Sequence, residues 1–183
     1  MVFVNKKNLY ACSEKKVNSG YFNGSVVIRE VYNGDNSPDH ELYFVEFLNG
    51  ALTTMHFHET EQILIPVYGK GVIGELRENS ISHFEIDDID LNYLDIGEIV
   101  SIPSNTLHFH GALPNQNFTH VALRKLFDYE CKNGVKSPYP TQTKWVSDFI
   151  GDELGSVDPE TIKNELGAIS DKVNQSIRRF ILG

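Results

Sequence analysis

The sequence has few of the features that mark secreted or membrane-bound proteins. Its 183 residues include two cysteines, Cys12 and Cys131, which lie far apart and form no CxxC pattern. We therefore expect two free thiols in a reducing cytoplasm rather than a disulfide. No apolar stretch is long enough for a signal peptide or a membrane span, so the expected location is cytoplasmic, with no membrane partner.

Positive charge is also scarce. The chain has 16 Lys and Arg residues against 25 Asp and Glu, a formal net charge of -9, and it contains no basic run. Nucleic acids and anionic membranes bind to positively charged surfaces, so neither is expected as a partner. The hydrophobic content of 40% is enough for a real core, and the length suits one domain with modest extensions.

Many short apolar segments separated by Gly, Asn and Pro predict an all-β domain. Asn49-Gly50 is a turn signal, and the acidic stretch 86–98 has the composition of a connector. Outside the histidine-rich segment 50–71, strands are expected over residues 25–32, 42–48, 71–76, 82–86, 98–103, 107–113 and 118–127. Strands at this spacing favour a closed antiparallel barrel or a jelly roll over residues 22–128, preceded by a polar N-terminal extension over residues 1–21.

The C-terminal part has a different pattern. Asp158-Pro159-Glu160 is typical of a helix start, and apolar residues then recur every three or four positions up to Ile181. The segment 143–150, with Trp145, is expected to form a shorter helix. Residues 129–183 are thus predicted to be a helical extension, packed either on the barrel or on a second subunit.

Five of the seven histidines lie in two short segments. His56 and His58 are one residue apart in a sequence typical of a strand, where such residues share one face, and Gln62 has the same parity. His108 and His110 repeat this spacing.

His120 follows in the next predicted strand. If residues 108–112 and 116–120 form a hairpin, His108 lies opposite His120. Imidazoles that converge from two segments in this way predict a metal site.

Two spaced motifs resemble those of the cupin superfamily. The first is Gly50-x5-His56-x-His58-x3-Gln62-x6-Gly69, and the second is Gly97-x5-Pro103-x-Asn105-x2-His108. The resemblance implies a double-stranded β-helix, a cupin jelly-roll barrel, and one divalent transition metal ion. It implies that the metal ligands are His56, His58, Gln62 and His108. It also implies a homodimer, because related cupins commonly pair through their sheets.

The segment HFHGA with a following His120 is similar to the small cupins that include manganese-dependent hydroxynitrile lyases. These cupins also have Gln at the fourth ligand position, where the common cupin has Glu, and Trp at the position of Phe109. The resemblance implies His120 as general base, His110 in the active site, and a small carbonyl or hydroxy compound as substrate. In this chain the segment between the motifs is longer, and both termini extend further.

A ligand set of three imidazoles and one amide is neutral, so a bound dication keeps its full formal charge. This favours Lewis-acid chemistry, as in lyases, over cycling to a higher oxidation state. Manganese is favoured by the resemblance, and iron, nickel, zinc or copper also suit these ligands. A mononuclear iron dioxygenase and a non-catalytic binding or sensing module remain alternatives. Arg124 has the parity of His120 and is expected in a salt bridge at the rim.

Overall fold

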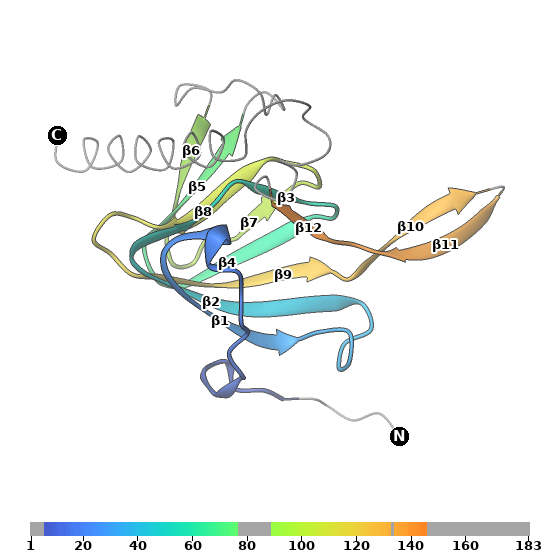
Figure 1. Cartoon of the computed structure of the whole chain (residues 1–183), viewed down its shortest axis with the longest axis horizontal. Coiled ribbons are helices and arrows are strands. Elements are labelled where there is room, and N and C mark those ends of the chain that lie inside the picture. Colours follow the sequence, from blue (N-terminus) through green and yellow to red (C-terminus); the bar gives the residue numbers. More distant parts are fainter. Residues whose placement is uncertain (1–5, 77–88, 133, 146–183) are drawn as a thin grey trace.

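The computed structural model of the chain describes residues 6–76, 89–132 and 134–145 (Figure 1). Two short 3-10 helices, η1 (Leu9–Ala11) and η2 (Ser19–Tyr21), precede the strands. The strands are β1 (Phe22–Tyr32), β2 (His40–Thr53), β3 (His56–His58), β4 (Gln62–Gly69), β5 (Gly71–Leu76), β6 (Ile89–Leu94), β7 (Val100–Ile102), β8 (His108–Ala112), β9 (Phe118–Lys125), β10 (Phe127–Lys132), β11 (Val135–Pro140) and β12 (Thr143–Trp145). The described part of the chain is therefore almost entirely β.

Ten of these strands are joined by hydrogen bonds into one curled antiparallel sheet. One half contains β1, β2, β9, β4 and β7, and the other contains β12, β3, β8, β5 and β6. The long strand β2 links the halves, because it pairs with β9 from His40 to Phe47 and reaches β8 where Leu52 lies opposite Gly111. This arrangement confirms the predicted antiparallel barrel.

The link through β2 depends on a bend at Asn49 and Gly50. Both residues have positive φ angles, 51° and 81°, and a Cβ atom at Gly50 would lie 3.2 Å from the Cα of Pro114. Glycine adopts this backbone conformation without steric cost. The predicted turn at these residues is wrong, because the strand bends there and continues to Thr53.

The predicted hairpin between residues 108–112 and 116–120 is also wrong. Strand β8 pairs with β2, β3 and β5, whereas β9 pairs with β2 and β4. The chain crosses from one half of the sheet to the other after β8, so His108 and His120 lie on different halves rather than side by side. Both side chains are fully buried.

The acidic stretch 86–98 contains a strand and is not only a connector. Residues Ile89–Leu94 form β6, which pairs with β5 along its full length. The strand expected over residues 82–86 lies outside the described residues.

The structure does not support the predicted helical extension. Strands β10 and β11 form a hairpin that projects from the barrel in Figure 1, and β12 then pairs with β3. Pro138 and Pro140 oppose helix formation there, and the Thr-Lys-Trp segment instead adds a strand to an available edge. No α-helix occurs among the described residues, and the helix predicted after Asp158 lies outside them.

Buried apolar side chains fill the barrel. One cluster includes Phe47, Leu64 and Phe118 from the half of the sheet that contains β9. The N-terminal segment packs against the outer part of β2, where the ring of Tyr10 lies 5.0 Å from that of Phe44. Within the described ranges, no helix combines the length and the apolar character needed to cross a membrane.

Candidate metal centre

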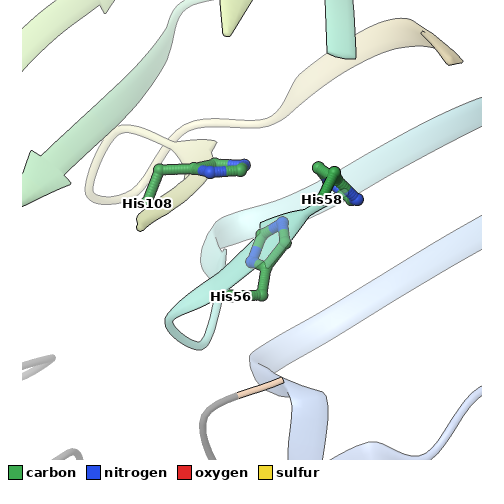
Figure 2. Close-up of side chains that lie close together, drawn as sticks. All are labelled: His56, His58 and His108. Atoms are coloured by element: carbon green, nitrogen blue, oxygen red, sulfur yellow. The ribbon is translucent and has the colours of Figure 1, made fainter. Parts of the chain in front are cut away.

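Three histidines come together inside the barrel, from β3 and β8. His56 lies directly opposite His108 in the sheet, and His58 follows on the same face of β3. Each of the three residues has one ring nitrogen that lies within 4.8 Å of a ring nitrogen of both other residues. Figure 2 shows the three rings close together, and each residue is at most 5% exposed. The cluster could therefore hold a metal ion.

Hydrogen bonds to backbone carbonyl oxygens orient two of the three rings. The Nδ1 atom of His56 lies 2.9 Å from the carbonyl oxygen of Thr54, and Nδ1 of His108 lies 2.8 Å from that of Thr106. A carbonyl oxygen only accepts, so the ring proton is assigned to Nδ1 in both residues. The Nε2 atom then carries a free lone pair, as a metal ligand requires.

Several buried acceptor atoms near the centre have no partner. Nε2 of His58, Nε2 of His108 and Oε1 of Gln62 make no hydrogen bond with any residue that the structure describes. Buried polar atoms without a partner are costly and need an explanation. A metal ion bound to the three clustered histidines would satisfy the two imidazole nitrogens, so the residues present fit the metal that the two motifs imply.

Burial also keeps these imidazoles neutral. Desolvation lowers the pKa of His108 to about 4 and the pKa of His56 and His58 well below 6.5. The neighbouring histidines lower the pKa of His56 and His58 further, because two positive charges would repel each other. Neutral rings at pH 7 are the form that binds metal.

His110 and His120 extend the cluster. The ring of His110 lies 5.5 Å from that of His56 and 5.0 Å from that of His120. His120 enters from β9, where its ring stacks on Phe47 at 5.6 Å. Burial alone lowers the pKa of His120 to about 3. Neither ring nitrogen of His120 has a hydrogen-bond partner within the described segments.

A cavity of about 500 Å³ borders this cluster. The predicted site residues that line the cavity are His56, His58, Gln62, His110 and His120, whereas the fully buried His108 does not. A volume of this size is typical of a small-molecule site. The structure thus places all six predicted residues in or beside one cavity that is open to solvent.

The wall of the cavity holds an ion pair between Arg124 and Glu41. The predicted salt bridge of Arg124 is present, but it is mostly buried in the cavity wall rather than at the rim, because the two side chains are only 11% and 9% exposed. Glu41 also accepts a hydrogen bond of 2.9 Å from the hydroxyl of Tyr43, which in turn is 2.7 Å from Nζ of Lys15. A chain of polar contacts therefore runs from the surface into the cavity.

Residues from both predicted extensions line the cavity, which the sequence interpretation did not foresee. Trp145 lies 4.4 Å from the ring of His56, and Tyr21 stacks on Trp145 at 4.3 Å with nearly parallel planes. Thr143 contacts His58. Thr and Trp favour strands, but three residues carry too little preference for the sequence to indicate a strand here.

The fold and the site define a β-barrel with a histidine cluster that could hold a metal, and comparisons with known proteins assign it to a family. No protein-family model and no curated protein sequence matches the chain. Among solved structures, a cupin-like protein from Thermotoga maritima is 31% identical, over 59% of this chain and 74% of its own, with a TM-score of 0.51. The chain belongs to the cupin superfamily.

Two further structures share the fold at lower identity. The polyketide cyclase RemF from Streptomyces resistomycificus is 14% identical over 79% of this chain and 86% of its own, with a TM-score of 0.55. A predicted oxalate decarboxylase from Thermotoga maritima is 14% identical over 63% of this chain and 94% of its own, with a TM-score of 0.51. At this identity the likeness concerns the fold alone.

Proposed function

We propose that the protein is a metal-dependent enzyme that applies Lewis-acid and general-base chemistry to a small carbonyl or hydroxy compound. Cleavage of a cyanohydrin is the nearest precedent, from the resemblance to hydroxynitrile-lyase-like cupins. The observation that carries the proposal is the cavity. Beside the candidate ligand atoms, Nδ1 of His110 and both ring nitrogens of His120 have no hydrogen-bond partner among the described residues.

The proposed ligands are His56, His58, Gln62 and His108, and manganese is the favoured metal. All four side chains are neutral, so a bound divalent ion supplies undiminished Lewis acidity that stabilises negative charge on a substrate oxygen. The amide of Gln62 comes from β4, in the half of the sheet opposite β3 and β8. The ligand set would therefore join both halves of the barrel.

His120 is the proposed general base. In cyanohydrin cleavage it takes the hydroxyl proton, the carbon–carbon bond breaks as the carbonyl forms, and the proton passes to the departing cyanide. The low pKa of His120 keeps the ring in the neutral form that a base requires, but the same low pKa weakens its affinity for a proton. Burial also makes the protonated ring unfavourable, which suits a reaction in which the proton is returned in the same turnover.

His110 lies between His120 and the three clustered histidines, and we assign it a position in the active site. An alternative role for His120 is to support a metal ligand through a hydrogen bond. The lack of any partner at its ring nitrogens, among the described residues, favours the role of base.

The first test concerns the metal. Protein purified without a histidine tag is expected to contain one divalent transition metal ion per chain, and His56→Ala or His108→Ala should reduce its occupancy sharply because each removes a ligand. Elemental analysis measures the stoichiometry, and His40→Ala, which removes an exposed imidazole, is the matched control. Unchanged stoichiometry in both ligand variants would disprove the site.

The second test concerns turnover. Manganese-loaded protein is mixed with the cyanohydrin of benzaldehyde, and aldehyde release is followed by absorbance. His120→Ala should retain the metal and lose on the order of 10²–10⁴ in rate. Loss of metal in this variant would instead indicate a supporting role. Oxygen consumption by iron-loaded protein, without aldehyde release, would replace the proposal with a dioxygenase.

A further inference from the structure

Strand β12 brings two residues from beyond the predicted barrel segment 22–128 against the proposed ligands. It pairs antiparallel with β3, so that Thr143 lies opposite His58 and Trp145 lies opposite His56. Directly opposite residues of an antiparallel pair are close enough for their side chains to interact. Each histidine of β3 therefore has one direct neighbour on β12.

The contacts of His58 differ from those of the other two clustered histidines. Its Nδ1 atom lies 3.0 Å from the Thr143 hydroxyl oxygen and 3.4 Å from Nη1 of Arg124. The hydroxyl can accept a hydrogen bond, whereas the guanidinium can only donate. Arg124 therefore favours the tautomer with the proton on Nε2, and the Thr143 hydroxyl is the neighbour that can accept a hydrogen bond from a proton on Nδ1.

Only one of these tautomers suits the proposed metal site. With the proton on Nδ1, His58 donates to Thr143 and Nε2 is left with a free lone pair. With the proton on Nε2, the ring accepts from Arg124 or from the Thr143 hydroxyl, but Nε2 then has no lone pair for a metal and makes no hydrogen bond within the described part of the chain. A buried donor without an acceptor costs free energy.

We propose that Thr143 is a positioning residue that holds His58 in the tautomer with a free Nε2 and so completes the metal site from outside the predicted barrel segment 22–128. The inference rests on the proposed metal site. Thr143 has for His58 the role that the carbonyl oxygens of Thr54 and Thr106 have for His56 and His108. The difference is that this acceptor comes from a separate strand, so the site depends on the docking of β12.

Three variants separate this role from a general effect on folding. Thr143→Val keeps the shape of the side chain and removes the hydroxyl, Thr143→Ser keeps the hydroxyl, and Lys144→Gln alters the neighbouring residue of the same strand. Affinity for Zn²⁺ is measured by competition with a chromophoric chelator. Loss of a hydrogen bond to a metal-ligating histidine typically costs 10- to 100-fold in affinity. We expect that loss in Thr143→Val and near-wild-type affinity in the other two variants.

A second measurement needs no metal. The ¹⁵N shifts of the His58 ring in the metal-free protein report which nitrogen carries the proton. We expect Nδ1–H in the wild type and in Thr143→Ser, and a shift toward Nε2–H in Thr143→Val. Unchanged Zn²⁺ affinity in Thr143→Val, or Nε2–H in the wild type, would overturn the inference. If the wild type binds no metal, the proposed function fails, and the tautomer measurement still decides the role of Thr143.

Discussion

Acid should destabilise the metal-free protein through its buried imidazoles, and His120 allows the size of the effect to be worked out. Its side chain is fully buried between aromatic rings, and its pKa is lowered from 6.5 to about 3. The unfolded chain therefore binds this proton near pH 6.5, while the folded protein resists it. The contribution of neutral His120 to the free energy of unfolding is fully present above pH 6.5 and is lost progressively as the pH decreases toward about 3.

The magnitude follows from proton linkage. One pKa unit corresponds to about 1.4 kcal/mol. Because folded His120 does not take up the proton that the unfolded chain binds, lowering the pH from 6.5 to 4 reduces the free energy of unfolding by about 3 kcal/mol. His108, with a pKa of about 4, acts in the same direction. A single domain is stable by only about 5–15 kcal/mol, so the loss is a large fraction of the total.

The assay is urea denaturation of chelator-treated protein at several pH values from 7 to 4, followed by circular dichroism. His120→Phe replaces the ring by one that does not titrate, and its unfolding free energy should depend less steeply on pH, by up to about 1.4 kcal/mol per pH unit. Removal of the exposed His40 is the matched control for the loss of one imidazole. An identical pH dependence in wild type and His120→Phe would refute the reasoning.

Two further predictions concern the backbone and the assembly. Gly69→Ala should lower the free energy of unfolding by more than about 2 kcal/mol, because φ is +72° and a Cβ atom would lie 1.9 Å from the carbonyl oxygen of Asn117. Gly97→Ala should lower it by roughly 1 kcal/mol, because φ is also positive there but no described residue beyond its two chain neighbours has an atom within 4 Å of the added Cβ. Urea midpoints compare the two, and equal losses would contradict the steric argument. A homodimer is expected, since large apolar side chains such as Tyr68 and Ile99 are more than half exposed. Light scattering at micromolar concentration should then give twice the chain mass of 20.7 kDa, and a monomer mass would count against it.

The sequence by itself determined the local features of this protein. Alternation along a strand placed His56 and His58 on one face, and the structure buries both. The expected strand over residues 71–76 is found as β5 with the same bounds. Gly69 and Gly97, which belong to the two motifs, both have positive φ angles, a conformation that glycine adopts easily. Each of these properties depends on a few neighbouring residues, and their chemistry is sufficient to predict it.

Only the tertiary structure decided which segments meet. The same alternation allowed β8 and β9 to pair, but their edges are taken by other strands, so His108 and His120 lie on opposite halves of the sheet. Three residues have too little local preference to define a strand, and Thr143–Trp145 forms one because the edge of β3 can bind it. Arg124 is buried for a similar reason, since Glu41 lies opposite it on the paired strand β2. Pairing between distant segments depends on competition among all strand edges, which no single stretch of sequence contains.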